Sequence, residues 1–319
     1  MTPLVSITVP IYNVEEYLDQ CISCLARQTL KEIEIILVDD GSTDSSPLIC
    51  DTWAKKDNRI KVIHKANGGS ASARQEGLDN STGEYIIVCD GDDWVELDMY
   101  EKLYQAAHNT NADIVFCQHI AEYSDGRSVQ NISLLTNVDD YDSMISEIFA
   151  GKISGSTWNK LVRRQFVIDG NIYYEPNINL SEDYLLFLKI MYLRPRVVQI
   201  SDCLYHYRRR IGSSSYTNCL YMENIIQMDK ITDWLKQHYD TNKYKSVFHQ
   251  RNIQRIYLCL RTKDLDVAYF KRFLKENILW QDFFKYRLTI KSILAYSSKV
   301  LPLSVMLFIF NKTYKYSYK

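Results

Sequence analysis

The first 120 residues alternate short apolar runs with amphipathic stretches, and this alternation restricts the fold more than any other feature. We expect strands at residues 5–9, 33–38, 60–64, 84–89 and 113–117. We expect helices between them at residues 13–28, 45–56, 72–78 and 97–108. Strands and helices that alternate over short connections predict an α/β domain with a mostly parallel sheet covered on both faces. Ligands of such sheets bind beyond the carboxyl ends of the strands.

Single residues indicate where some of these elements begin and end. Pro10 is expected to stop the first strand, because proline cannot donate a ladder hydrogen bond. Asn13 and Glu16 have the spacing of a capping box for the helix that follows. Ser181 is expected to cap a later helix at 181–193.

Beyond residue 120 the regular alternation weakens. We expect helices at 141–149 and 159–167, the helix at 181–193, and a strand at 197–207. From residue 218 onward the pattern is almost entirely helical, with many Tyr, Leu, Ile and Lys residues. We therefore predict an α/β domain over residues 1–215 and a helical C-terminal region over 216–319.

Composition excludes some classes of protein. The 38 basic and 39 acidic residues nearly cancel, so we expect no nucleic-acid partner. The N-terminus lacks a basic segment followed by an apolar core, so we expect no secretory signal and a cytoplasmic location. The most apolar stretch, 300–310, falls short of the roughly 20 residues that span a bilayer. Cys21 and Cys24 are expected to be reduced and packed, because no second Cys or His pair completes a zinc site.

Two groups of aspartates each follow an apolar strand. Asp39 and Asp40 follow one strand, and Asp90, Asp92 and Asp93 follow another. Carboxylates at strand ends converge on the binding crevice, where crowded like charges need a cation. Hard oxygen ligands suit Mg or Mn bridged to a diphosphate. The alternative is that these aspartates only form turns and cap helices.

Five segments in the same order resemble glycosyltransferase family 2 enzymes of the GT-A fold. The resemblance covers roughly residues 4–215 and rests on VSITVPIYN (5–13), LVDDGSTD (37–44), NGGSASARQEG (67–77), GEYIIVCDGDDW (83–94) and SEDYLLFLK (181–189). It implies a GT-A, Rossmann-like sheet flanked by helices. It also implies an inverting, metal-dependent glycosyltransferase with a nucleotide-sugar donor, typically a UDP-sugar.

The resemblance assigns the donor side of the site to named residues. It implies that Pro10 and Tyr12 line the nucleoside pocket and that Asp40 bonds the base. A carboxylate can accept the imide N–H of uracil, and a tyrosine can stack on its ring. Arg74 would lie near the nucleotide, where its fork could neutralise phosphate; the alternative is an exposed helix charge.

The metal motif and the base follow from the same resemblance. Residues Asp90 to Asp93 would form the metal motif, with Asp92 near the ribose and the Mn or Mg ion and Asp93 as a further ligand. The Glu182–Asp183 pair matches the family's base, which makes Asp183 the expected proton acceptor. The alternative is that both carboxylates only complement a helix N-terminus.

Two further segments, with weaker signals, resemble pieces common in the capsule and surface-polysaccharide branch of this family. Trp158, Asn159 and Lys160 could contact an acceptor sugar, or Trp158 could simply be a core residue. The cationic segment with His206, Arg208 and Arg210, followed by Ser213 and Ser214, could close over a diphosphate, or it could be a solvated loop.

Residues 281–319 carry seven basic side chains against one acidic, which gives 7 − 1 = +6. A basic, aromatic tail suits an anionic membrane surface, and the alternatives are packing on the catalytic domain or a homodimer. The membrane interpretation predicts a peripheral protein on the inner membrane face whose glycan acceptor is lipid-linked.

Two other functions stay open from the sequence. One is a non-catalytic protein that binds nucleotide or glycan, and the other is a different metal-dependent nucleotide-sugar enzyme. The N-terminal strand lacks the glycine-rich loop of a nucleotidyl transferase or P-loop enzyme, which disfavours those classes.

Overall fold

The computed structural model describes residues 2–210, 221–278, 301–302 and 305–306. The chain separates into two compact units, residues 1–216 and 217–319. The sequence pattern predicts this change of organisation near residue 215. Each unit is described by itself below.

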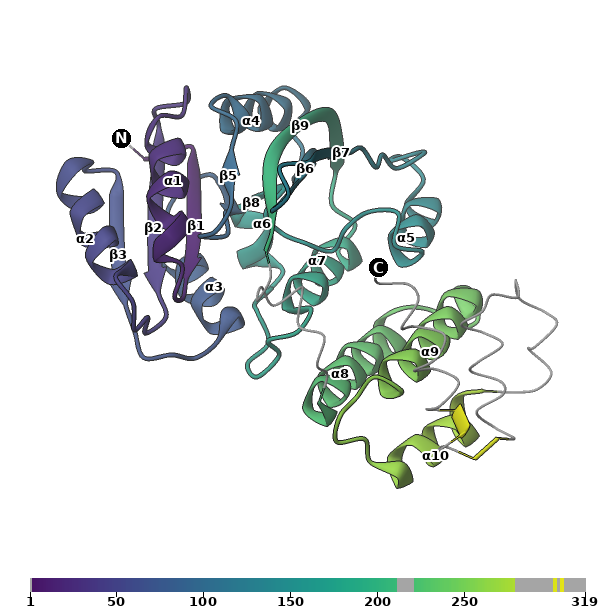
Figure 1. The fold of residues 1–319 in the computed structure, drawn as a ribbon. Helices are drawn as coiled ribbons and strands as arrows, with labels where there is room; N and C mark the ends of the chain where they lie inside the picture. Colours follow the sequence, from purple (N-terminus) through teal and green to yellow (C-terminus); the bar gives the residue numbers. More distant parts are fainter. Residues whose placement is uncertain (1, 211–220, 279–300, 303–304, 307–319) are drawn as a thin grey trace. The chain divides into compact units, whose positions relative to one another are not determined.

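The first half of the sheet is parallel, as the alternating pattern predicts (Figure 1). It runs in the order β3-β2-β1-β4, with bounds β1 (Val5–Ile11), β2 (Ile33–Asp39), β3 (Ile60–His64) and β4 (Tyr85–Val88). The helices that connect these strands, and the one that follows them, are α1 (Glu15–Ala26), α2 (Ser46–Lys56), α3 (Ser70–Asp79) and α4 (Met99–Thr110). All seven residues of β2 are buried, because both faces of the sheet are covered.

The two faces of β1 meet different helices. Val5, Ile7 and Val9 share a core with α1, which also buries Cys21 and Cys24. On the opposite face α3 packs directly on the sheet. A Cβ added at Gly77 of α3 would lie 2.7 Å from Cβ of Thr8, so only glycine allows this approach. The close packing brings the N-terminal half of α3 to the carboxyl edge of the sheet.

The second half of the sheet adds antiparallel pairs to the parallel ones. Its strands are β5 (Trp94–Val95), β6 (Ile114–Tyr123), β7 (Ser128–Asn131), β8 (Lys160–Arg163) and β9 (Val197–Arg209). β8 is antiparallel to both β4 and β6, β9 is parallel to β6, and the two-residue β5 is antiparallel to β9. The helices of this half are α5 (Tyr141–Phe149), α6 (Arg164–Asp169) and α7 (Glu182–Tyr192).

Several local expectations are wrong. The helix expected at 159–167 is the strand β8 followed by the short α6. β1 continues through Pro10, which is tolerated because β4 pairs with β1 only as far as Thr8. Asn13 does not cap α1: it has φ of 50°, and its side chain accepts from the backbone N–H of Thr43. Ser181 has φ of 63° and makes no side-chain cap hydrogen bond.

The second unit contains α8 (Met222–His238), α9 (Lys245–Cys259) and α10 (Val267–Asn277). Ile225, Ile256 and Phe270 contribute one residue from each helix to its apolar core. None of the helices that the structure describes is long and apolar enough to cross a membrane. The basic tail at 281–319 and Ser213 and Ser214 lie outside the described residues, apart from four positions in the tail.

Glu34 on β2 links the parallel strands at the edge opposite the aspartate clusters. It accepts hydrogen bonds from Ser6 of β1 (2.6 Å), Lys61 of β3 (2.5 Å) and both the backbone N–H and the hydroxyl of Thr82, which precedes β4 (2.7 Å each). Burial disfavours its charge, but these hydrogen bonds outweigh burial and lower the pKa of Glu34 to about 2. A pKa below the unfolded value means that the ionised carboxylate stabilises the fold.

We expect Glu34→Gln to lower the free energy of unfolding at neutral pH by about 2 kcal/mol. The parent keeps the contribution of Glu34 above the ordinary glutamate pKa of 4.5 and loses it as the pH falls toward 2. The stability curves of parent and variant should therefore converge on acidification. Urea denaturation across this range measures the difference, with the exposed Glu32→Gln as control. Curves that stay parallel would show that the charge of Glu34 does not stabilise the sheet.

Candidate active site

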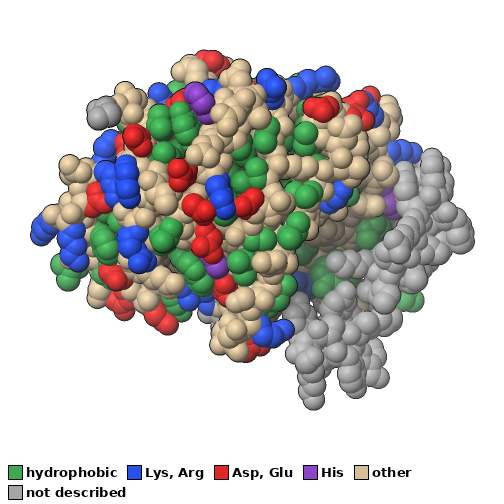
Figure 2. Space-filling model, turned by 90° about the horizontal axis from the view of Figure 1, so that it is seen from above, with side chains coloured by type: hydrophobic (Ala, Val, Ile, Leu, Met, Phe, Trp, Pro, Cys, Tyr) green, Lys and Arg blue, Asp and Glu red, His purple; other side chains and the backbone are tan. Residues whose placement is uncertain are grey.

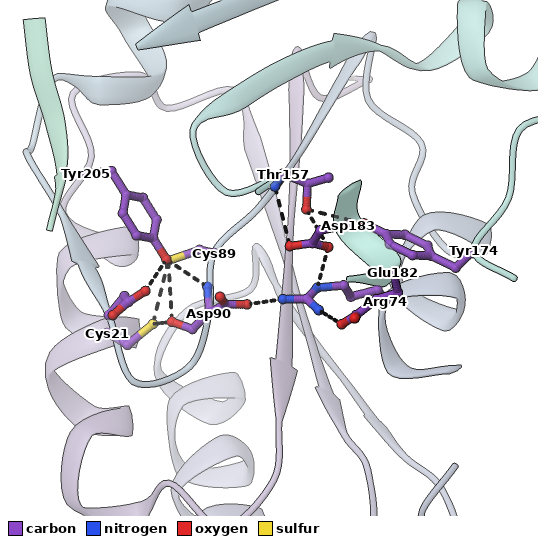
Figure 3. A network of polar contacts seen from close by, with 10 residues as sticks. Cys21, Arg74, Cys89, Asp90, Thr157, Tyr174, Glu182, Asp183 and Tyr205 are labelled. Carbon is purple, nitrogen blue, oxygen red and sulfur yellow. Dashed lines mark hydrogen bonds and ion pairs between the residues drawn. The ribbon is translucent and has the colours of Figure 1, made fainter. Parts of the chain in front are cut away.

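One buried guanidinium joins carboxylates from two parts of the chain (Figure 3). Arg74, on α3, donates from Nη2 to Oδ1 of Asp90 after β4 (2.7 Å) and from Nη1 to Oε1 of Glu182. Its Nε lies 3.3 Å from Oδ1 of Asp183, an ion pair without hydrogen-bond geometry. Glu182 and Asp183 form the first turn of α7. The metal motif and the expected base therefore meet at a single side chain.

The electrostatics of this group depend on burial. Burial raises the pKa of the Asp90 carboxyl to about 6, and the charges of Asp183 and Asp92 act in the same direction, while Arg74 lowers it. Burial also raises the pKa of Asp183, again opposed by Arg74. The carboxylates in turn hold the pKa of Arg74 well above its usual value, so the guanidinium stays charged. Figure 2 shows acidic side chains gathered around basic ones near the middle of one face.

Arg74 is therefore not the exposed helix charge of the alternative interpretation, since it is 7% exposed. The guanidinium fork faces three carboxylates, and its contact with phosphate stays a prediction. A buried cation in this position offsets the repulsion between carboxylates that would otherwise be crowded together.

The metal motif follows β4 and divides into two kinds of carboxylate. Asp93 is 1% exposed, and its oxygens accept from the hydroxyl of Tyr205 and the backbone N–H of Arg208, both at 2.7 Å. The same hydroxyl accepts from the backbone N–H of Asp90 at 3.1 Å. Asp93 thus faces β9 and fixes the loop, and its role as a metal ligand stays a prediction.

Asp90 and Asp92 are the carboxylates that fit a divalent cation. Oδ1 of Asp90 pairs with Arg74 and Oδ2 of Asp92 with Nε of Arg210 (2.8 Å), which leaves each with one oxygen that has no hydrogen-bond partner among the described residues. No group of three His, Cys, Asp or Glu side chains in the described part of the chain could hold a metal by itself. Mg and similar hard cations need only one or two carboxylates when substrate phosphates and water complete the shell.

On the nucleoside side, Tyr12 is 50% exposed and Pro10 is half-buried, so the tyrosine ring is open to stacking. Asp40 is 3% exposed and already accepts from Nζ of Lys65 (2.7 Å) and from the backbone N–H groups of Gly68 (2.9 Å) and Gly69 (2.8 Å). Its carboxylate fixes the loop at the start of α3. Contact with a base would have to share these oxygens with the loop.

The segment 157–160 is buried, which favours the packing interpretation over contact with a sugar. Trp158 is 6% exposed and stacks on Tyr205 with ring centroids 4.3 Å apart. Asn159 donates to the backbone carbonyl of Cys117. Lys160 is 2% exposed, and burial lowers its pKa to about 7.

Three predicted site residues, His206, Arg208 and Arg210, lie at or just past the end of β9, and they have different partners. His206 contacts Glu122 (2.8 Å) and Glu96 (2.9 Å) through its two ring nitrogens, rather than the metal-motif carboxylates. Arg208 donates from Nε to the backbone carbonyl of Asp92 (2.8 Å), and Arg210 pairs with the Asp92 carboxylate. The two arginines, but not the histidine, therefore lie against the metal motif.

The sequence motifs assign no role to two residues of the site. The hydroxyl of Thr157 donates a hydrogen bond to Oδ1 of Asp183 (3.0 Å). The hydroxyl of Tyr205 contacts Asp90 and Asp93 and so holds the loop of the predicted metal motif, residues 90–93, which is called the metal loop from here on. Their sequence signal is weak, because a threonine or a strand tyrosine is common in any buried segment. Both lie next to residues that the motifs do single out, Trp158 and His206.

The match to a family model decides the classification. The model described as "Glycosyl transferase family 2" matches residues 6–169, which span β1 through α6. The chain belongs to glycosyl transferase family 2. It is 36% identical over 216 residues to the putative glycosyltransferase EpsH of Bacillus subtilis, covering 66% of this chain and 62% of that protein. It is 36% identical over 226 residues to the glycosyltransferase GlyG of Streptococcus pneumoniae, covering 67% and 73%.

Another relative and two solved structures complete the comparison. The uncharacterized glycosyltransferase EpsJ of B. subtilis is 38% identical over 67% of this chain, which spans 63% of its length. The chain thus spans just under two thirds of EpsH and EpsJ. S. aureus TarS 1–349, solved with UDP-GlcNAc, superposes with a TM-score of 0.71 at 18% identity, over 99% of this chain and 93% of that one. The mannosyltransferase PcManGT of Pyrobaculum calidifontis gives 0.57 at 13%, over 100% and 89%. These likenesses concern the fold, which is the GT-A fold.

We expect Arg74→Gln to lower the free energy of unfolding by about 3 kcal/mol, because it leaves the buried Glu182 and the partly buried Asp90 and Asp183 without their cation. Glu182→Gln added to this variant should restore part of the loss, since it removes one of the repelling charges. Urea denaturation of the four proteins in the double-mutant cycle measures the coupling. Additive effects would contradict the network.

Proposed function

We propose that this chain is an inverting, metal-dependent glycosyltransferase that moves a sugar from a UDP-sugar to a glycan acceptor in surface-polysaccharide synthesis. The observation that carries the proposal is the contact of Arg74 with Asp90 on one side and with Glu182 and Asp183 on the other. With Asp90 on the donor side and Asp183 as the base, the contact supports a donor half and a base that lie within one side chain of each other. Such closeness suits a single displacement at one carbon.

The donor half is assigned to residues around the carboxyl ends of β1, β2 and β4. Tyr12 stacks on the base, and Asp40 and the loop it holds form the nucleoside side of the pocket. Asp90 and Asp92 would hold Mn or Mg, which when bound supplies positive charge for the diphosphate. Arg208 and Arg210 add positive charge beside the same motif.

The acceptor half is assigned to Asp183. Its carboxylate takes the proton of the acceptor hydroxyl, whose oxygen then forms a bond to the anomeric carbon as the bond to the diphosphate breaks. Attack opposite to the leaving group inverts the configuration. Arg74 keeps the charges of Asp90 and Asp183 compatible while both are ionised.

Relatives and structural neighbours guide the choice of substrates. TarS was solved with UDP-GlcNAc and PcManGT with GDP-Man and Mn2+, so we place a UDP-sugar first and a GDP-sugar second. A 31% identical relative is the minor teichoic acid biosynthesis protein GgaB of B. subtilis, which supports a surface-glycan acceptor. A lipid-linked acceptor would place the chain at the cytoplasmic membrane face, with the basic tail at 281–319 as membrane contact or, alternatively, as a homodimer contact.

We expect UDP together with Mn to raise the melting temperature of the parent by roughly 5 °C at a concentration far above the dissociation constant. Asp92→Asn should lose most of the Mn-dependent part, because one candidate ligand oxygen becomes an amide. The exposed Asp125→Asn serves as control. A melting temperature that responds to UDP equally with Mn and with a chelator would contradict the metal assignment.

We expect Asp183→Asn to lower the release of free nucleotide from the best donor of a UDP- and GDP-sugar panel by about 10³-fold, since an amide cannot accept the proton. Its affinity for UDP should stay close to that of the parent. The exposed Asp169→Asn is the matched control. A parent that binds nucleotide but releases no free nucleotide from any donor, with any acceptor, would instead support the non-catalytic alternative.

A further inference from the structure

The buried segment 157–160 is tied down at each of its residues, although its side chains are closed to a sugar. Asn159 is hydrogen-bonded to β6 through the Cys117 carbonyl (2.7 Å). Nζ of Lys160 donates to the carbonyls of Ser154 (2.8 Å) and Ser156 (2.6 Å). A segment held this firmly beside a catalytic base is suited to positioning it.

Thr157 is the member of this segment that reaches the base. Its hydroxyl oxygen lies 3.0 Å from Oδ1 of Asp183, and its backbone nitrogen lies 3.4 Å from Oδ2. Thr157 is 6% exposed, so water does not replace these contacts readily. Figure 3 shows Thr157 and Arg74 approaching the Asp183 carboxylate from different elements.

The direction of the hydrogen bonds follows from chemistry. An ionised carboxylate can only accept, so the Thr157 hydroxyl donates to Asp183. The hydroxyl of Tyr174, 3.4 Å from Oγ1 of Thr157, must then be the donor in that contact. Oδ1 of Asp183 is thus held by Thr157 and faces Nε of Arg74 at 3.3 Å. Among the described residues, Oδ2 has only the long backbone contact, and it is the oxygen left for the acceptor proton.

We propose that Thr157 is a positioning residue that fixes Oδ1 of Asp183 and so turns Oδ2 toward the acceptor hydroxyl. The inference rests on the proposed function, in which Asp183 is the base. It makes Tyr174 the outer member of a hydroxyl chain that ends on Asp183. It also gives the segment 157–160 a purpose in the reaction without contact to the sugar.

The same segment reaches the metal loop. Trp158 stacks on Tyr205, whose hydroxyl contacts both Asp90 and Asp93. Neighbouring residues of one short segment therefore support the base and the loop that carries the donor-side carboxylates. Because Thr157 and Trp158 are adjacent in the chain, the two supports have a fixed spacing, and each reaches its half of the site through a hydrogen bond or a ring contact.

Loss of the Thr157 hydroxyl has a predictable electrostatic sign. Its hydrogen bond is one of the interactions that lower the pKa of Asp183 against the effect of burial. The charged and titratable groups that act on Asp183 from the elements around it stay in place, and they are Arg74, Glu182, Asp90, Lys160 and Tyr174. Without the hydroxyl, the acidic limb of the pH–rate profile should therefore move to higher pH.

The test compares Thr157→Val, which keeps the shape and removes the hydroxyl, with Thr157→Ser, which keeps the hydroxyl. The measured quantity is nucleotide release from the donor that the parent chain turns over best. We expect Thr157→Val to lower kcat about tenfold or more, as for the loss of a hydrogen bond to a charged group, with KM for the donor within about twofold. Thr157→Ser should restore most of the rate. The buried Thr262→Val, in the second unit, is the matched control.

Each outcome decides the matter. A Val variant with parental kcat and an unmoved acidic limb overturns the positioning role. A Ser variant as slow as the Val variant also overturns it, because the retained hydroxyl would then fail to restore the rate. If Thr157→Val does not fold, Tyr174→Phe tests the same hydroxyl chain, because it removes the hydroxyl that donates to Thr157. We expect this variant to lower kcat about threefold. An unchanged kcat overturns the proposal. A parent that turns over no donor refutes the proposed function. This result differs from a parent and a Val variant that are equally active, which refutes only the positioning role of Thr157.

Discussion

The contact of one buried guanidinium with three carboxylates is the constraint on which the site depends. Arg74 can reach Asp90, Glu182 and Asp183 only because α3 lies directly against β1, where Gly77 meets Thr8. Without that cation, the carboxylates of two distant segments would repel one another in a poorly solvated place. The packing of a helix on a sheet is therefore also what makes the charges of the site compatible.

The two halves of the sheet contribute different things. The parallel half supplies strand ends, and with them Tyr12, Asp40 and the metal loop. The mixed half supplies the supports: β8 follows the segment that carries Thr157, and β9 carries Tyr205 and Arg208 and leads into Arg210. The antiparallel pairing of β9 with β5, which directly follows Asp93, brings β9 beside the metal loop.

Periodicity predicted the parallel half closely, because each strand there is a continuous apolar run with a helix after it. It missed β5 and β7, which have two and four residues, and took β8 for helix, because short strands carry little pattern. The aspartates at strand ends were found, but not their partners. Thr157 meets Asp183 across 26 positions and Tyr205 meets Asp93 across 112, and no local pattern reports such pairs. The motif predicts a ligand role for Asp93 but not its contacts with Tyr205 and Arg208.

The dependence of the metal loop on Tyr205 has a consequence for the order of folding. The loop begins at Asp90, yet the hydroxyl that fixes it belongs to a residue 115 positions later. Closing so long a loop costs entropy before any contact repays it, so local structure forms first. On the ribosome, the chain can complete β1 to β4 early, but the geometry of its acidic loop waits until β9 has left the exit tunnel. The parallel strands of the nascent chain can thus form well before the loop at Asp90 takes its final geometry.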